Sequence, residues 1–149
     1  MLVKKNIIFI CTGNACRSQI AHGLLESMAG DKFEVFSAGS HPSQVHPMST
    51  KIMEEIGIDI SHYTSDFIDD YLKSGIEIVI TVCDNANKNC PVFPGNVERL
   101  HWSINDPFEG WEFDESQIQS FRDTREEIKQ RIIVKLVGGI GQVIQQMNL

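Results

Sequence analysis

Long apolar runs, internal repeats and an excess of basic residues are all absent from this sequence. Its 149 residues include 13 Lys or Arg against 20 Asp or Glu, which gives a formal net charge of −7. A protein that binds nucleic acid needs clustered positive charge to neutralise phosphates, so we expect no nucleic-acid partner. The apolar run that follows residues 1–5 is too short for a signal peptide or a membrane span. We therefore expect a cytoplasmic protein without a membrane contact.

Low-complexity tracts and linkers are missing as well. A length of 149 residues suits one domain with its own core and is short for two. The hydrophobic content of 42% and the charged content of 22% are ordinary for a globular protein. We expect residues 1–149 to form a single domain and the protein to be a monomer.

Cysteine is scarce, and its positions are informative. The chain has only Cys11, Cys16, Cys83 and Cys90. Permanent disulfides are rare in the cytosol, and neither pair has the two-residue spacing of a zinc knuckle. We therefore expect no bound metal, and we interpret the cysteines as reactive thiols.

Short apolar stretches alternate with amphipathic stretches along the chain. Apolar runs and period-2 alternation predict strands, whereas helical spacing and capping signals predict helices. The predicted strands cover residues 6–10, 33–37, 76–82 and 97–102. The predicted helices cover residues 18–28, 47–57, 65–75 and the tail from about residue 116, whose last part is interrupted by Gly138, Gly139 and Gly141.

This alternation favours an α/β fold with a four-stranded parallel sheet and helices on both faces. Ligands of such folds bind at the carboxyl ends of the strands. Cys11 and Cys83 each come directly after a predicted buried strand. We therefore expect their two loops to be neighbours at one edge of the sheet.

Residues 11–18, Cys-Thr-Gly-Asn-Ala-Cys-Arg-Ser, connect a predicted strand to a predicted helix. Such a loop directs backbone N–H groups and the positive end of the helix dipole into one concavity, which suits a tetrahedral oxyanion. The same field favours the nucleophilic thiolate form of Cys11, and Arg17 adds donors matched to phosphate-like oxygens. The alternative is an inert buried Cys11 with Arg17 in a surface ion pair. The flanking strand, glycine and helix favour the oxyanion site.

The residues between Cys83 and Cys90 are polar or small. A segment of this composition buries little surface and is easily remodelled. If it forms a helical turn, the two Cα atoms lie about 10 Å apart, which exceeds the limit of about 7 Å for a disulfide. A bond between them would then require unwinding. The alternative is a surface loop with two incidental thiols, but exposed thiols without a use are a liability, so we prefer a redox role.

Asp106 precedes Pro107, which restricts the local backbone and keeps Asp106 out of the helical conformation. Placed over the oxyanion loop, the Asp106 carboxyl would protonate a leaving oxygen. An Asp-Pro pair is also a common turn, so this interpretation depends on the loop at residues 11–18.

Together these segments resemble the thioredoxin-coupled arsenate reductases, which share the fold of the low-molecular-weight protein tyrosine phosphatases. The oxyanion loop and Asp106–Pro107 fit both groups, whereas Cys83 and Cys90 point to the reductases. The residues that carry the resemblance are 11–18, Ser37-Ala38-Gly39, Thr81-Val82-Cys83, Asn89-Cys90-Pro91, His101-Trp102 and Asp106-Pro107.

The resemblance implies a three-cysteine relay. Cys11 attacks arsenate while Asp106 protonates the departing hydroxyl. Cys83 then attacks Cys11, which releases arsenite, and Cys90 attacks Cys83, which moves the disulfide to a position where reduced thioredoxin can reach it. No bound cofactor is expected, because thioredoxin is the external electron donor.

The resemblance also implies roles within the loop. Ser18 donates to the Cys11 sulfur and holds it anionic, Asn14 shapes the loop, and the Cys16 thiol is structural and buried. The residues expected to bind the substrate are Thr12, Gly13, Asn14, Ala15, Cys16, Arg17 and Ser18.

Two alternatives remain open. The first is a tyrosine phosphatase that acts through a phosphocysteine on Cys11. An aromatic side chain should then flank the cleft, and residues 40–47, the expected lip, contain none. The second is a non-catalytic oxyanion-binding or redox-sensing module, which the presence of every group needed for chemistry disfavours.

Overall fold

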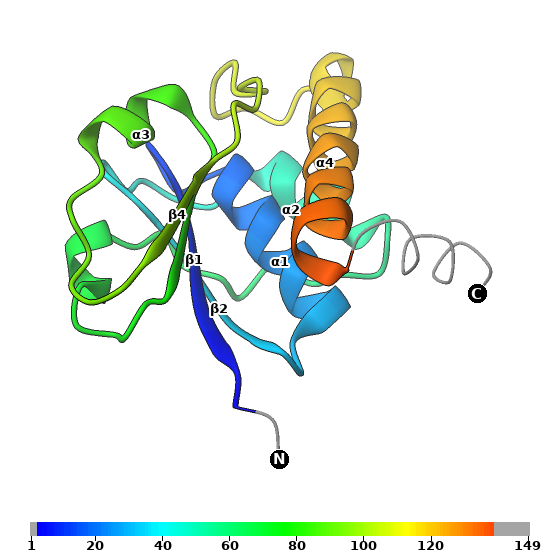
Figure 1. The fold of residues 1–149 in the computed structure, drawn as a ribbon. Coiled ribbons are helices and arrows are strands. Elements are labelled where there is room, and N and C mark those ends of the chain that lie inside the picture. The colour runs from blue at the N-terminus through cyan, green and yellow to red at the C-terminus, as the bar shows by residue number, and fades with distance from the viewer. Residues whose placement is uncertain (1–2, 139–149) are drawn as a thin grey trace.

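A parallel sheet of four strands forms the centre of the computed structural model, which describes residues 3–138. The strand order is β2-β1-β3-β4 (Figure 1). The strands are β1 (Lys5–Cys11), β2 (Phe33–Gly39), β3 (Ile78–Thr81) and β4 (Glu98–His101). The predicted parallel α/β fold is confirmed, although β3 and β4 are shorter than the stretches predicted as strands, residues 76–82 and 97–102.

The strand β1 is central because its residues 7–10 are all apolar and fully buried. Parallel sheets covered on both faces require such continuous apolar strands. The register pairs Cys11 with Gly39 and Ile10 with Thr81, and Thr81 in turn with His101. The carboxyl ends of all four strands therefore lie at the same edge.

Helices cover both faces of the sheet. The helices α1 (Arg17–Ala29), α2 (Pro47–Glu54) and α4 (Ile118–Ile132) lie on one side, and α3 (Asp84–Asn89) and the 3₁₀ turn η1 (Ile68–Tyr71) lie on the other (Figure 1). The side chains of two consecutive residues of β2 point to opposite faces of the sheet. Ser37 contacts His22 of α1, whereas the Phe36 ring packs on Tyr71 of η1 with centroids 5.4 Å apart.

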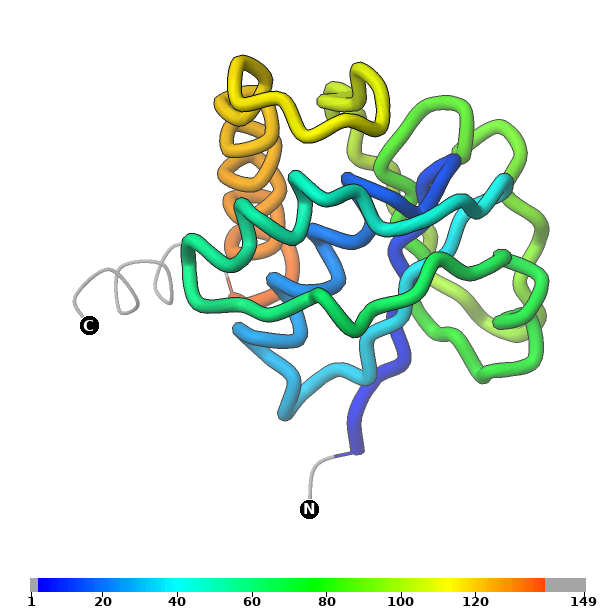
Figure 2. The backbone as a smooth tube through the Cα atoms, turned by 180° about the vertical axis from the view of Figure 1, so that it is seen from behind, coloured from blue at the N-terminus to red at the C-terminus, as the bar shows by residue number. Residues whose placement is uncertain are grey.

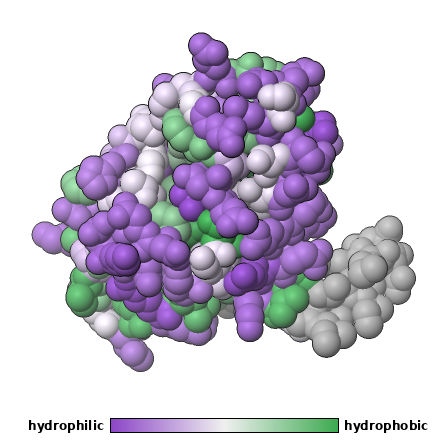
Figure 3. All heavy atoms as spheres, turned by 90° about the horizontal axis from the view of Figure 1, so that it is seen from above, coloured by the Kyte–Doolittle hydropathy of each residue, from purple (hydrophilic) through white to green (hydrophobic). Residues whose placement is uncertain are grey.

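The segment between β4 and α4 crosses over the carboxyl edge of the sheet (Figure 2). Seen from above, this side of the molecule is mainly hydrophilic and surrounds a small hydrophobic area (Figure 3). No helix within residues 3–138 combines the length and the apolar character needed to span a membrane.

The predicted helix at residues 65–75 is wrong, because only the short η1 forms there. Ser65 does not cap a helix: its hydroxyl donates to Gly13 O, and it accepts from the backbone of Ser43. Phe67 is extended and forms an isolated parallel bridge with Gly39. Tertiary hydrogen bonds to neighbouring loops therefore override the local helical pattern.

The C-terminal helix is confirmed as α4, which continues into a π-helical turn, η3 (Ile133–Val137), and ends at Gly138 with a φ of 136°. Only glycine adopts such a backbone readily. The prediction for the tail after Gly138 lies outside the described residues.

An ion-pair cluster joins α2 to α4. Glu55 accepts from Arg122 Nη2 at 2.6 Å and from Arg125 Nη1 at 3.0 Å. Arg125 is buried, and its guanidinium also donates to Ile52 O at 2.7 Å. The hydrogen bond from Arg122 is the main reason why the pKa of Glu55 falls from 4.5 to about 2.

We expect the substitution Glu55→Gln to flatten the acid dependence of stability. A carboxyl whose pKa is lower in the folded state stabilises the fold above its unfolded pKa, and this contribution is lost as the pH falls through the folded value. For Glu55 the loss runs from pH 4.5 down to about 2. Urea denaturation across this range should show a steeper fall in the free energy of unfolding for the wild type than for Glu55→Gln.

The matched control is Glu54→Gln, one residue earlier on α2. Glu54 forms no ion pair within the described part of the chain, so its variant should follow the wild-type slope. Equal slopes for the wild type and Glu55→Gln would contradict this account.

Candidate active site

The loop between β1 and α1 has its carbonyl groups bonded away from the site. Cys11 O, Thr12 O and Ala15 O accept from the backbones of Ser40, His41 and His46. In contrast, the N–H groups of residues 13–16 find no acceptor within residues 3–138. Unpartnered amides at the start of a helix form a nest that binds anions. We call residues 11–18 the anion loop.

Two backbone constraints shape the anion loop. Asn14 has a φ of 47°, a left-handed conformation that Asn adopts more readily than most residues. Gly39, at the end of the neighbouring strand β2, lies so close to the loop that a Cβ atom there would collide with Thr12 O. Glycine is required at this position because β2 and the loop pack backbone against backbone.

The Cys11 sulfur is buried and held by Ser18. Its Sγ lies 2.9 Å from Ser18 Oγ, and Asn14 Nδ2 donates to the same Oγ at 2.7 Å. Because Ser18 Oγ accepts from Asn14, its own proton is free to point at Cys11 Sγ. Asn14 is held in turn by the backbone N–H of Asp66, which donates to its Oδ1 at 2.9 Å. The arrangement presents Cys11 as a hydrogen-bond acceptor, which suits a thiolate.

Arg17 connects the anion loop to the segment that follows β4. Its Nη1 donates to Ile104 O at 3.0 Å, and its Nη2 lies 3.2 Å from Asp106 Oδ2. The other carboxylate oxygen of Asp106 accepts from Phe108 N at 3.0 Å. The structure thus brings Cys11, Arg17 and Asp106 to one site, as the sequence predicts.

These groups surround a cavity of about 220 Å³. The expected lip at residues 40–47 contains no aromatic residue, but Phe108 and Trp111 line the cavity, so the argument against a phosphatase drawn from that lip is wrong. Both aromatic residues come from the segment that returns over the sheet after β4. The cavity is lined by Cys11, Thr12, Gly13, Ala15, Cys16, Arg17, Ser43, Asp106, Phe108 and Trp111.

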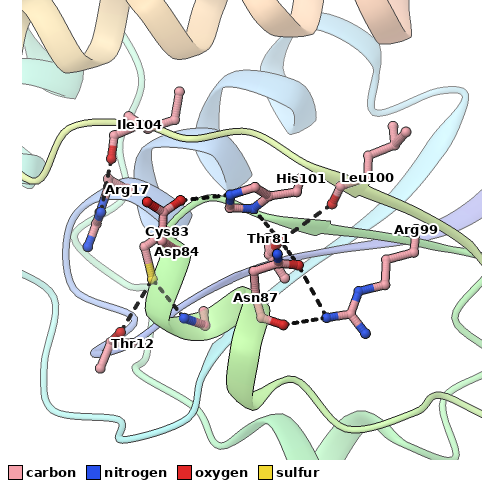
Figure 4. A network of polar contacts seen from close by, with 11 residues as sticks. Thr12, Arg17, Thr81, Cys83, Asp84, Asn87, Arg99, Leu100, His101 and Ile104 are labelled. Carbon is pink, nitrogen blue, oxygen red and sulfur yellow. Dashed lines mark hydrogen bonds and ion pairs between the residues drawn. The ribbon is translucent and has the colours of Figure 1, made fainter.

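Cys83 lies beside the anion loop and caps α3. Its buried Sγ lies 3.3 Å from Thr12 Oγ1 and accepts from the backbone N–H of Ala86, also at 3.3 Å (Figure 4). The predicted proximity of the loops that follow β1 and β3 is therefore present, and a second thiol faces the edge of the site.

Cys90 follows the last residue of α3, where it is half-buried, and burial raises the pKa of its thiol. Between the two cysteines only Ala86 is buried. The helical segment separates their Cα atoms by about 10 Å, too far for a disulfide without unwinding. Because only Ala86 of α3 is buried, unwinding this helix would expose little apolar surface.

Polar contacts from β3 and β4 hold α3 in place, and no local sequence pattern predicts them. His101 Nε2 lies 2.8 Å from Asp84 Oδ1, and its Nδ1 lies 2.7 Å from Thr81 Oγ1. Arg99 Nη2 donates to Asn87 O at 2.7 Å (Figure 4). These exposed or half-exposed contacts fix the helix without burying it.

The Cys16 thiol lies in the anion loop but is held in its neutral form. It is buried, and burial is the main reason why its pKa rises to about 12. A thiol with such a pKa carries almost no thiolate at neutral pH and is a poor nucleophile. Cys16 therefore contributes its backbone N–H to the anion loop, whereas its thiol does not react.

The sequence of this chain is similar to those of known proteins. The profile of the family described as low molecular weight phosphotyrosine protein phosphatase matches residues 6–145. Arsenate reductase 1 of Staphylococcus epidermidis is 47% identical over 129 residues, which are 87% of this chain and 93% of that protein.

Solved structures of arsenate reductases have folds similar to that of this chain. An arsenate reductase in the phosphate binding state has a TM-score of 0.68 and 34% identity, over 86% of this chain and 93% of its own. A thioredoxin-dependent arsenate reductase of Corynebacterium glutamicum has a TM-score of 0.61 and 32% identity, over 88% of this chain and 63% of its own. The chain therefore belongs to the low molecular weight phosphotyrosine protein phosphatase family and, within it, to the arsenate reductases.

Proposed function

We propose that the protein reduces arsenate to arsenite through Cys11, Cys83 and Cys90, and that thioredoxin recycles it. The observation that carries this proposal is the position of Cys83, whose Sγ lies 3.3 Å from Thr12 Oγ1, next to the nucleophile. Hydrolysis of a phosphoester needs no second thiol there. The relative from Staphylococcus epidermidis and the thioredoxin-dependent relative from Corynebacterium glutamicum support the same assignment.

The first step forms a bond between sulfur and arsenic. Arsenate binds to the free amides of residues 13–16 and to Arg17, the two groups that match a tetrahedral oxyanion. The Cys11 thiolate, which accepts from Ser18, attacks arsenic. Asp106 protonates the departing oxygen, which leaves as water. The proton that Asp106 passes on is one that the hydrogen arsenate ion itself brings into the site.

The second step transfers the electrons. The Cys83 thiolate attacks Cys11 Sγ, forming a disulfide and breaking the bond between Cys11 and arsenic. Arsenic keeps that electron pair and leaves as arsenite, so two thiols are oxidised while arsenic(V) is reduced to arsenic(III). Cys83 already contacts Thr12, the residue that follows Cys11, before the reaction begins.

The third step moves the disulfide outward. The Cys90 thiolate attacks Cys83 Sγ and releases Cys11 as a thiolate, which requires α3 to unwind. Burial raises the pKa of Cys90 in the folded helix, and unwinding exposes the thiol and removes this effect. Reduced thioredoxin then returns the Cys83–Cys90 disulfide to two thiols, so no bound cofactor is needed.

The substitution Cys90→Ser tests the relay. The variant should form close to one arsenite per protein molecule and then stop, because its Cys11–Cys83 disulfide has no internal resolving thiol. Arsenite formation with thioredoxin, thioredoxin reductase and NADPH measures turnover, and peptide mapping after thiol alkylation identifies the disulfide.

The matched control is Lys88→Ser, an exposed position two residues earlier on α3. It should turn over like the wild type. Sustained thioredoxin-dependent turnover by Cys90→Ser would disprove the relay.

A weaker phosphatase activity is the second candidate, and Phe108 and Trp111 favour it. Both line the cavity with about 37% and 39% of their surface exposed, so they can contact an aromatic ring that follows a phosphate. Such a reaction needs Cys11, Arg17 and Asp106 but neither Cys83 nor Cys90.

We expect p-nitrophenyl phosphate hydrolysis to persist in Cys90→Ser and to vanish in Cys11→Ser. Release of p-nitrophenolate measures the rate. A loss of hydrolysis in Cys90→Ser would show that the two chemistries share the third thiol, contrary to this assignment.

A further inference from the structure

His46 is fully buried beside the active site, yet none of the steps above uses it. It immediately precedes α2, and its backbone N–H donates to Ala15 O of the anion loop at 3.1 Å. Its imidazole Nδ1 accepts from Met48 N at 3.1 Å, which caps α2. The other ring nitrogen, Nε2, lies 2.7 Å from Gly110 O. His46 therefore joins the anion loop through its backbone, and the start of α2 and Gly110 through its ring.

The partners of His46 determine its protonation state. Nδ1 accepts from a backbone N–H and cannot carry a proton, whereas Nε2 faces a carbonyl oxygen and must donate. The ring is thus the neutral Nε2–H tautomer, with both nitrogens satisfied. In this form His46 connects the start of α2 to Gly110.

Aromatic side chains pack around the same ring. Trp111 stacks on His46 with centroids 5.4 Å apart and an interplanar angle of 19°. Phe108 contacts His46 edge-on at 5.7 Å, and Phe121 of α4 lies on another side at 5.0 Å. Phe108 and Trp111 also line the cavity, so His46 supports the wall of the active site from behind.

The segment 105–113 has few other attachments. Its polar contacts to the rest of the described chain are the Arg17–Asp106 ion pair and the His46–Gly110 hydrogen bond. An oxyanion in the site recruits Arg17 and competes with Asp106 for its guanidinium. The hydrogen bond to Gly110 is then the polar contact that keeps the segment over the anion loop.

We propose that His46 is a positioning residue that holds Asp106 and the aromatic wall over the anion loop while the substrate is bound. The catalytic part of this inference rests on the proposed function, because it assigns the positioned carboxyl the task of protonating the departing oxygen. The positioning itself is a property of the fold and can be measured without arsenate.

Two substitutions separate the contacts of the ring. His46→Asn keeps an acceptor for Met48 N, since Asn is a good helix cap, but is too short to reach Gly110 O. His46→Gln places an amide N–H near the position of Nε2 and gives up the cap. We expect His46→Asn to lower the single-turnover rate of arsenite formation at least ~10-fold with little change in KM. His46→Gln should keep the rate within a few-fold and melt at a lower temperature.

A double-mutant cycle shows whether His46 acts through Asp106. If it does, adding His46→Asn to Asp106→Asn lowers the rate no further. The proposal would be overturned if the fold-loss in the double variant equalled the product of the two single losses. It would also be overturned if His46→Asn kept the wild-type rate, or if His46→Gln lost more of the rate than His46→Asn.

Fluorescence of Trp111 supplies the test that is independent of activity. In a Trp102→Phe background Trp111 is the sole tryptophan, and His46→Asn should increase its quenching by acrylamide while His46→Gln should not. Equal quenching in the parent and His46→Asn would overturn the proposal. Absence of arsenite formation by the wild type would instead refute the proposed function and leave the fluorescence result to decide the positioning.

Discussion

Parallel pairing of β1 with both β2 and β3 is the constraint on which the rest of the structure depends. It places the carboxyl ends of the strands at the same edge of the sheet, so Cys11 and Cys83 lie at that edge. Thr12, which follows Cys11, contacts Cys83 although the two are 71 positions apart in the sequence. It also places Gly39 against the anion loop, where any side chain would displace the backbone. The apolar residues of β1 thus determine both the core and the edge of the sheet at which Cys11 and Cys83 lie.

Arg17 and His46 then attach distant segments to this edge. Arg17 bonds to Ile104 and Asp106, and His46 bonds to Ala15 and Gly110. Both contacts end on the segment between β4 and α4, which has little regular structure of its own. The site therefore combines a rigid floor, formed by β1 and α1, with a wall whose position depends on a few hydrogen bonds.

Local features of the sequence were sufficient to predict the floor of the site. The strand, the anion loop and α1 are contiguous, so residues 5–29 already specify how Cys11 and Arg17 meet. The helix predicted from Ser65 failed because its capping hydroxyl bonds to Gly13, far away in the chain. The aromatic wall and the role of His46 were missed for the same reason. Phe108 and Trp111 lie far beyond the anion loop in the sequence and reach the site only through the tertiary fold. His46 directly precedes Pro47, and no local pattern there indicates its contact with Gly110.

The cap of α3 has a consequence for the order of events in this protein. The sulfur that accepts from Ala86 N is that of Cys83, the same atom that the relay would oxidise. A sulfur engaged in a disulfide is a poorer acceptor and is drawn toward its new partner, so oxidation withdraws support from a helix with one buried side chain. The helical state of this segment and the oxidation state of the protein are thus linked variables. In the proposed relay, the reduced fold therefore keeps Cys90 half-buried, and oxidation of Cys83 weakens the helix that precedes Cys90.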